Sequence, residues 1–215
     1  MKNNLTEIVF ILDRSGSMSG LEKETIGGYN SLIKKQRREK GDAIISTVLF
    51  DNQIEVLHDR VNLKDINDIT EKDYFVRGST ALLDAVGSSI AHMRKVYRYT
   101  RKEDRPSKTL FVITTDGYEN ASREYDYKKV RDMIKHQKDK YDWEFLFLGA
   151  NIDAVGEASK FGIDASKAVK YECDSKGTEL NYAVLNEAVC NVRMGNRLDA
   201  SWKSKIESDY KKRHK

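Results

Sequence analysis

The sequence is poor in proline, cysteine and long apolar runs. Its 215 residues include one proline, Pro106, and two cysteines. Pro106 lies in a polar stretch, 101–107, just before an apolar run, where it indicates a loop and not a domain boundary. Cys173 and Cys190 lack the CxxC spacing of zinc and redox motifs, so the sequence favours two reduced thiols over a disulfide.

No segment of the chain is apolar over a membrane-spanning length. Residues 1–7 are polar, and the apolar run 8–12 is far too short for a signal-peptide core or a membrane span. We therefore expect no membrane association and a cytoplasmic location. The chain also lacks a Gly/Ser linker, an internal repeat and a low-complexity segment, and its length suits one large α/β domain.

Charge of one sign is scarce except at the C-terminus. The 38 basic and 34 acidic residues are mixed along most of the chain, which gives a net charge of +4. The excess gathers in the last residues, Lys203, Lys205, Lys211, Lys212, Arg213, His214 and Lys215. This pattern favours a solvated basic tail, with nucleic-acid binding through the tail as an alternative.

Short β-rich runs alternate with longer amphipathic stretches along the whole chain. This alternation predicts an α/β fold, a three-layer α/β/α sandwich around a mostly parallel central sheet. Continuous apolar runs predict strands at 7–12, 44–50, 108–114, 144–148 and 168–171. The run 53–58 follows Asp51 and Asn52 so closely that it predicts an antiparallel edge strand.

Helix-like apolar spacing marks the segments between the strands. It predicts helices at 21–38, 81–97, 127–140, 154–160 and 178–193. Apolar side chains then recur every four residues from the end of the domain into the tail, at Met194, Leu198, Trp202, Ile206 and Tyr210. We therefore expect a domain over 1–198 and a basic tail over 199–215 that continues as a helix and packs back on the domain.

The most informative motif follows the first predicted strand. Asp13, Ser15 and Ser17 form the pattern Asp-x-Ser-x-Ser directly after a buried apolar run. In an open α/β sheet, residues just past the carboxyl end of a strand are directed into the crevice where ligands bind. The three side chains are therefore expected to converge on one point.

Two further segments supply oxygen atoms at the same expected edge. Thr80 ends a Gly-Ser-Thr segment before a predicted helix, and Asp116 follows the predicted strand 108–114 in a Thr-Thr-Asp-Gly segment. All of these groups are hard oxygen donors, without histidine or cysteine. Such a set suits Mg²⁺, Mn²⁺ or Ca²⁺ and disfavours zinc.

Together the three segments resemble the metal-ion-dependent adhesion site (MIDAS) of von Willebrand factor type A domains, which integrin inserted domains also contain. The resemblance covers roughly residues 6–195, and some bacterial intracellular proteins of this superfamily are similar through 116–122 and 145–153. It implies that Ser15, Ser17 and Thr80 offer hydroxyls to the metal, whereas Asp13 and Asp116 bind it directly or through water. It also implies a protein partner whose Asp or Glu carboxylate completes the coordination of Mg²⁺.

Two other kinds of interpretation remain open: ordinary structural roles for these residues, and an enzymatic function. Taken singly, Asp13, Asp116 and Thr80 suit turns or helix caps. Glu119 and Asn120 favour a plain surface loop, as do Arg14, Arg77 and Tyr118. A Mg²⁺-dependent phosphohydrolase of the haloacid-dehalogenase type is the main enzymatic alternative, but its pattern has a second acid where this chain has Ser15. The sequence therefore favours a binding module over an enzyme.

Overall fold

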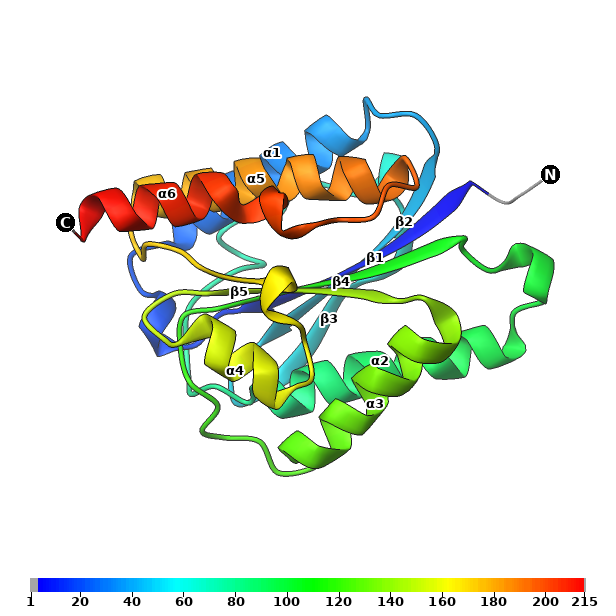
Figure 1. Ribbon diagram of the computed structural model, residues 1–215, viewed down its shortest axis with the longest axis horizontal. Coiled ribbons are helices and arrows are strands. Elements are labelled where there is room, and N and C mark those ends of the chain that lie inside the picture. Colours follow the sequence, from blue (N-terminus) through cyan, green and yellow to red (C-terminus); the bar gives the residue numbers. More distant parts are fainter. Residues whose placement is uncertain (1–3, 215) are drawn as a thin grey trace.

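The computed structural model describes residues 4–214 and contains one sheet within that range. Its strands are β1 (Leu5–Asp13), β2 (Asp42–Phe50), β3 (Ile54–Asn62), β4 (Lys108–Thr115), β5 (Glu144–Gly149) and β6 (Ala168–Lys170). They lie in the order β3-β2-β1-β4-β5-β6, and every neighbouring pair is parallel except β2 and β3 (Figure 1). The predicted mostly parallel sheet with one antiparallel edge strand is confirmed.

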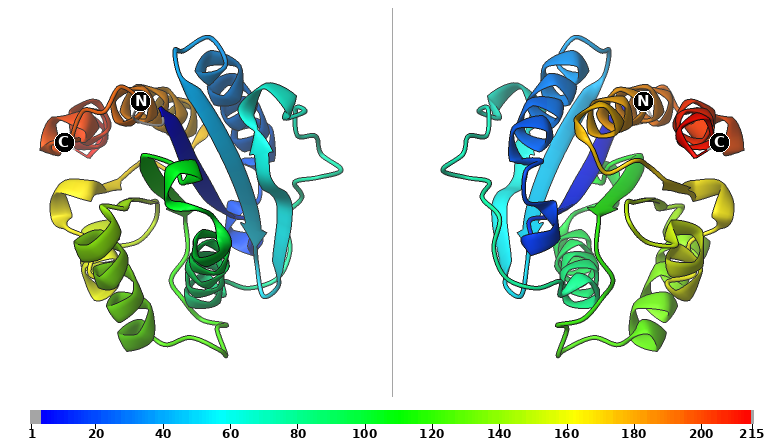
Figure 2. Two further views of the ribbon diagram at one scale, coloured as in Figure 1. Left: turned by 90° about the vertical axis from the view of Figure 1, so that its right-hand side faces the viewer. Right: turned by 90° about the vertical axis from the view of Figure 1, so that its left-hand side faces the viewer.

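Helices cover both faces of this sheet and complete a three-layer sandwich (Figure 2). One face carries α1 (Glu22–Gln36), α5 (Ser175–Arg193) and α6 (Ser204–Arg213). The other carries α2 (Leu82–Tyr99), α3 (Tyr127–Tyr141) and α4 (Ala154–Lys160).

Strand β1 is buried on both faces, which explains its continuous apolar sequence. Successive side chains of a strand point to opposite faces of the sheet. Phe10 accordingly packs in the core under α1 and α5, with its ring centroid 5.5 Å from that of Tyr29, whereas Ile11 packs in the core under α2 and α3. A strand between two helical layers therefore has no position for a polar residue facing solvent.

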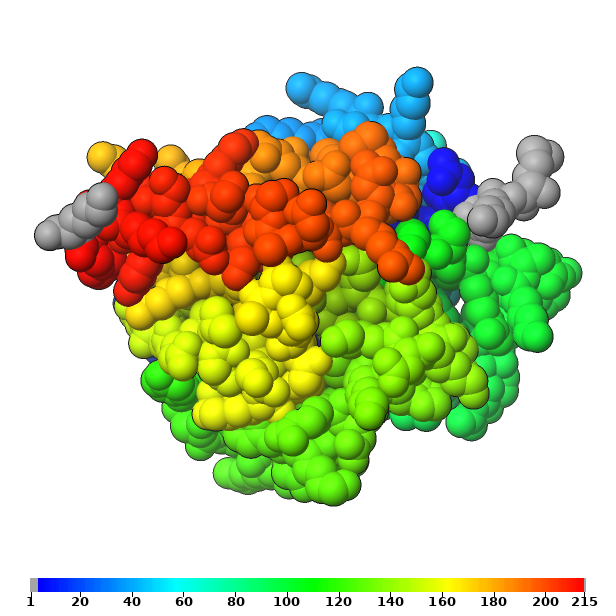
Figure 3. All heavy atoms as spheres, viewed as in Figure 1, coloured from blue at the N-terminus to red at the C-terminus, as the bar shows by residue number. Residues whose placement is uncertain are grey.

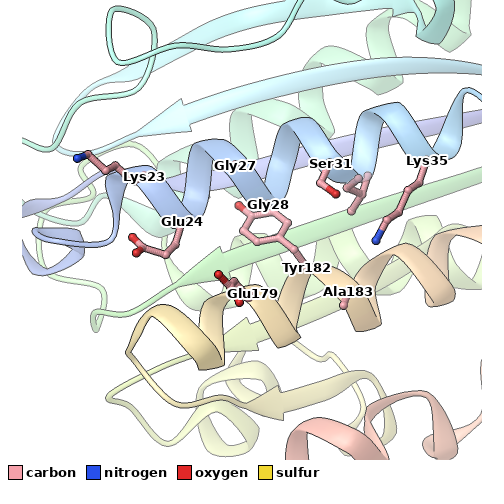
Figure 4. A pocket seen from close by; sticks show the side chains of 10 residues that line it. Lys23, Glu24, Gly27, Gly28, Ser31, Lys35, Glu179, Tyr182 and Ala183 are labelled. Carbon is pink, nitrogen blue, oxygen red and sulfur yellow. The ribbon is translucent and has the colours of Figure 1, made fainter.

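Helices α1 and α5 run side by side from the carboxyl edge of the sheet and meet closely at one glycine. The ring of Tyr182 from α5 lies against Gly28 of α1 (Figure 4). A Cβ atom on Gly28 would lie 2.3 Å from Tyr182 Cδ2, whereas a Cβ atom on the preceding Gly27 would meet nothing within 4 Å. The close contact thus requires glycine at position 28 only.

The tail departs from the unbroken helix that its four-residue spacing predicts. Helix α5 ends at Arg193, and Met194 is 64% exposed. Gly195 has a φ of 82°, in the left-handed region that glycine adopts readily, and this conformation ends the helix. The chain resumes as a helical turn and α6, and the buried Leu198 and Ile206 join the core. Figure 3 shows α6 in red along the surface beside the yellow segment.

Several tail residues bind the domain through polar contacts. Trp202 Nε1 donates to the carbonyl of Ser166 at 2.8 Å, and the largely buried Lys203 Nζ donates to two carbonyls of the segment 165–168. Arg213 pairs with Asp174 at 2.5 Å. Within residues 4–214, no helix combines the length and the apolar character that crossing a membrane demands.

Candidate metal centre

The topology brings two acidic residues to neighbouring strand ends. The chain leaves β1 for β2 on one side, and β4 later pairs with β1 on the other, so the direction of strand order switches between β1 and β4. Such a switch point is where open α/β sheets bind ligands. Asp13 is the last residue of β1 and Asp116 follows the last residue of β4, which places both carboxylates at this crevice.

Hydrogen bonds from the neighbouring segments hold each of the two carboxylates. Ser15 Oγ lies 3.1 Å from Ser17 Oγ, and Ser17 Oγ donates to Asp116 Oδ1 at 2.5 Å. Asp13 is held in place separately, because its Oδ1 accepts from the backbone N–H of Ser15 at 2.7 Å and its Oδ2 accepts from the hydroxyl of Thr115 at 2.5 Å. The first and third sequence segments therefore meet through side-chain oxygen atoms.

Thr80 reaches the same place from the second segment. A Cβ atom built on Gly117 would lie 3.1 Å from Thr80 Oγ1 and 3.3 Å from Ser17 Oγ, so both hydroxyls border the space beside this glycine. The site thus has a small cradle that any larger side chain at position 117 would fill. The structure brings together all five expected residues: Asp13, Ser15, Ser17, Thr80 and Asp116.

Backbone hydrogen bonds fix the segment before Thr80 to the strand ends. The N–H of Gly16 donates to the carbonyl of Gly78 at 3.1 Å, and the N–H of Ala81 donates to the carbonyl of Asp51 at 2.8 Å. Gly78 adopts a φ of 67°, and a Cβ atom there would lie 2.1 Å from the side-chain oxygen of Asn52. Only glycine allows this approach, and the approach sets the position of Thr80.

A buried charge network reinforces this segment. Asp51 Oδ2 accepts from Arg14 Nε at 3.0 Å and from Arg77 Nε at 2.7 Å, and both Arg14 and Asp51 have 0% exposure. The ring centroid of Phe75 lies 5.3 Å from the guanidinium carbon of each arginine. The expectation of a surface position is therefore wrong for Arg14, since a buried acid compensates its charge.

Glu119 and Asn120 hold the start of α2 and are not a plain surface loop. Asn120 Oδ1 accepts from the N–H of Thr80 at 2.9 Å, and the carbonyl of Thr80 accepts from the N–H of Asn120 at 3.0 Å. Glu119 Oε2 accepts from the N–H of Leu83 in the first turn of the helix at 2.8 Å. The sequence contained no signal for these contacts, because they join segments about 40 residues apart in the chain.

Among residues 4–214, no basic side chain pairs with Asp13 or Asp116. Burial raises the pKa of Asp13 to about 6, hydrogen bonds from Ser15 and Thr115 oppose the rise, and the charge of Asp116 adds to it. Burial also raises the pKa of Asp116. Such a pair lowers its electrostatic free energy when a cation lies between its members.

Cys173 is a rim residue that the sequence did not reveal. Its Sγ lies 3.9 Å from Asp116 Oδ2, and burial raises the pKa of the thiol, which favours the protonated form. Cys173 and Cys190 are both free thiols. Among residues 4–214, no three His, Cys, Asp and Glu side chains gather as a metal site, so an ion at this edge needs the hydroxyls as ligands.

Comparison with solved structures identifies the fold. The structure of proximal thread matrix protein 1 from the mussel byssus with a zinc-occupied MIDAS motif matches with a TM-score of 0.60 and 14% identity, over 86% of this chain and 46% of that one. A von Willebrand factor type A structure from Catenulispora acidiphila matches with a TM-score of 0.53 and 13% identity, over 84% of this chain and 41% of that one. The chain has the von Willebrand factor type A fold.

A third match is manganese-loaded Plasmodium vivax TRAP protein, with a TM-score of 0.53 and 19% identity, over 69% of this chain and 58% of that one. This chain spans about half the length of the proximal thread matrix protein 1 chains that it matches. No protein-family model matches the sequence, and no curated protein sequence matches it. At these identities the likeness establishes the fold alone.

Proposed function

We propose that the chain binds one divalent cation at the carboxyl edge of its sheet, with oxygen ligands from Asp13, Ser15, Ser17, Thr80 and Asp116. Mg²⁺ is the proposed ion, with Mn²⁺ and Ca²⁺ as alternatives. The observation that carries the proposal is the gathering of hydroxyls around the Gly117 cradle between two carboxylates without a basic partner. Hard cations prefer this donor set.

We further propose that the bound ion serves recognition of a partner protein in the cytoplasm. Three of the five proposed ligands are neutral hydroxyls and only two are carboxylates. The ion therefore keeps enough positive charge to attract a third carboxylate. A partner that presents an Asp or Glu side chain supplies it, and chelation of the metal then removes the affinity. The zinc-occupied and manganese-loaded sites of the similar structures support the metal part of the proposal.

The residue two positions after Asp13 disfavours the enzymatic alternative. A phosphohydrolase of this type needs a second acid beside the nucleophilic carboxylate to protonate the leaving group. Ser15 takes the position of that acid, and the hydroxyl of Ser15 contacts Ser17. The proposed role is therefore binding without turnover.

The contacts of the tail disfavour the nucleic-acid alternative. Arg213 pairs with Asp174 and Asp209, and His214 lies 2.7 Å from Glu172. Charges that are compensated within the chain contribute less to the counterion release that drives non-specific binding to nucleic acid. The folded tail therefore has a weaker positive potential than the number of its basic residues indicates.

Thermal unfolding with and without metal tests the ion. Wild-type protein stripped with EDTA is expected to gain thermal stability with Mg²⁺ or Mn²⁺ as the ion concentration rises. Asp116→Asn is expected to lose that gain. Ser19→Ala, an exposed neighbour of the motif, is the matched control and should respond as wild type does. A response of Asp116→Asn equal to that of wild type would refute the assignment.

A displayed peptide library tests the partner chemistry. Selection on immobilised protein in Mg²⁺ is expected to enrich peptides that contain an acidic residue, which EDTA then releases. Replacing that residue by Asn or Gln should abolish binding. Peptides that bind equally in EDTA, or that tolerate the amide, would contradict the carboxylate bridge even where the metal itself binds.

A further inference from the structure

A second polar cavity lies at the opposite edge of the sheet, where β4 and β5 begin. Its volume is about 250 Å³, and it opens between the C-terminal ends of α2 and α3. Arginines and aromatic rings line it: Arg94, Arg98, Arg105, Tyr97, Tyr141 and Trp143. No acidic residue is part of this wall, so the cavity has the opposite charge to the proposed metal site.

The arginines of α2 are not compensated within the protein. Arg94 and Arg98 are exposed, lie four residues apart on one helix, and form no ion pair with any residue of 4–214. Like charges at this spacing destabilise a helix. Arg105 is fixed on the rim by a hydrogen bond from its Nε to the carbonyl of Thr100 at 3.0 Å. The wall thus presents guanidinium groups, which bind phosphate through two parallel hydrogen bonds.

Aromatic rings form the base of the cavity. Trp143 is 3% exposed, with its ring centroid 5.4 Å from that of Tyr97 in an edge contact and 6.5 Å from that of Tyr141. Tyr141 is 43% exposed and therefore has ring surface free for a ligand. Aromatic side chains next to arginines are a common surface for stacking a nucleobase.

Gln137 provides a polar group that the fold leaves unused. It lines the cavity and has 0% exposure, yet neither its amide nitrogen nor its amide oxygen has a hydrogen-bond partner among residues 4–214. A buried amide without partners costs free energy, and such a group in a folded protein calls for a bound water or ligand. An amide offers a donor beside an acceptor, which matches the adjacent acceptor and donor on the edge of adenine.

We propose that this cavity binds a mononucleotide. The arginines hold its phosphate, Tyr141 stacks on its base, and the amide of Gln137 bonds to the base edge. The volume of about 250 Å³ lies just below the range of about 300–1,000 Å³ that is usual for small-molecule sites, so the ligand is no larger than one nucleotide. This inference is independent of the proposed metal site, which lies at the other edge of the sheet.

Tryptophan fluorescence measures this binding directly. The chain has two tryptophans, so Trp202→Phe leaves Trp143 as the only reporter. In EDTA, which keeps the metal site empty of added ions, AMP, GMP, CMP and UMP are titrated against ribose 5-phosphate and inorganic phosphate. We expect saturable quenching by AMP below ~1 mM and at least ~10-fold weaker binding of the probes without a base. No saturation by any nucleotide, or equal affinity for phosphate alone, would overturn the proposal.

Two variants separate binding from folding. Arg98→Gln is expected to weaken AMP binding at least ~10-fold, while Lys95→Gln, an exposed residue of the same helix outside the cavity wall, leaves it unchanged. Gln137→Leu removes the unpartnered amide, so it should raise the melting temperature of the free protein and weaken AMP binding. Unchanged AMP affinity in Arg98→Gln or in Gln137→Leu would contradict the proposed contacts.

Discussion

At the carboxyl edge of the sheet, Asp13 and Asp116 lie together without a basic partner, whereas at the amino edge Arg94 and Arg98 border a cavity without an acidic one. Several buried charges elsewhere in the described chain have a partner of opposite sign: Arg14 pairs with Asp51, and the buried Glu157 lies 2.7 Å from Lys160. The two edges of the sheet differ from these pairs, because each gathers charges of one sign.

The comparison shows how one sheet separates two kinds of ligand chemistry. Groups with perturbed electrostatics concentrate at functional sites because ligands, and not neighbouring side chains, complete them. The carboxyl edge suits a hard cation and the amino edge suits an anion. Substitutions can therefore separate effects on the stability of the fold from effects on Mg²⁺ affinity at one edge and AMP affinity at the other.

The largest expected effect comes from Asp51→Asn. The change removes the buried acid beside the fully buried Arg14 and leaves it only the half-exposed Glu55, 2.7 Å from its Nη1. Loss of one member of a buried pair costs at most about 3–5 kcal/mol of unfolding free energy. Urea unfolding measures the loss. Asp59→Asn, which removes an exposed partner of His92, is the control and should change stability by less than about 1 kcal/mol. Equal stability of the two variants would show that the network under Thr80 is not structural.

The pH dependence of stability should come next in size. Burial raises the pKa of Glu7 from 4.5 to about 7, so between these values the folded chain binds a proton that the unfolded chain has released. The stabilisation is fully present below pH 4.5 and is lost as the pH rises through 7, by up to about 3 kcal/mol. Glu7→Gln should flatten this slope in urea unfolding at pH 5 and 7.5. A slope that is unchanged in the variant would assign the effect to other groups.

A smaller loss should follow from Gly28→Ala. A Cβ atom 2.3 Å from the Tyr182 ring forces α1 and α5 apart, and overpacking of this kind costs about 1–3 kcal/mol. Gly27→Ala, with nothing within 4 Å of its Cβ atom, should instead be neutral or stabilising in thermal unfolding. Because neither glycine is a proposed metal ligand or lines the cavity at the amino edge, neither Mg²⁺ nor AMP affinity should change in either variant.

Gly117→Ala should have the smallest effect on stability and a selective one on binding. The new methyl group would lie 3.1 Å from Thr80 Oγ1 and 3.3 Å from Ser17 Oγ, in the space proposed for the ion. We expect Mg²⁺ affinity to fall about tenfold, which is about 1.4 kcal/mol, with AMP affinity unchanged. Calorimetric titration of both ligands measures this, and equal loss of both affinities would mean a general disturbance of the fold.

The sequence predicted the parts of this molecule that follow from local pattern. Continuous apolar runs located the strands, and three polar segments, at the ends of β1 and β4 and before α2, contain the five candidate ligands. The predicted sheet is confirmed, and the candidate ligands lie near one another, because a parallel sheet aligns its carboxyl ends. Their role as metal ligands stays a prediction. Predicting the fold from the sequence required no knowledge of side-chain contacts.

Features that depend on contacts between distant segments could not be predicted. Arg14 appears as an ordinary loop residue until Asp51 is brought beside it, and Asn120 has no visible role until α2 begins next to it. The cavity at the amino edge had one usable signal: Gln137 continues the apolar face of Val130 and Ile134 at helical spacing. A polar residue on the buried stripe of a helix is an indication of an unsatisfied group.

Calorimetric titration of Mg²⁺ into metal-free protein shows whether the carboxyl edge binds an ion, with Ser17→Ala and Ser19→Ala as the matched pair. We expect one Mg²⁺ per chain for wild type and for Ser19→Ala. Ser17→Ala should bind at least about tenfold more weakly, because the Ser17 hydroxyl contacts both Ser15 and Asp116. Absence of Mg²⁺ binding in wild type, or equal binding by both variants, would contradict the proposed metal site.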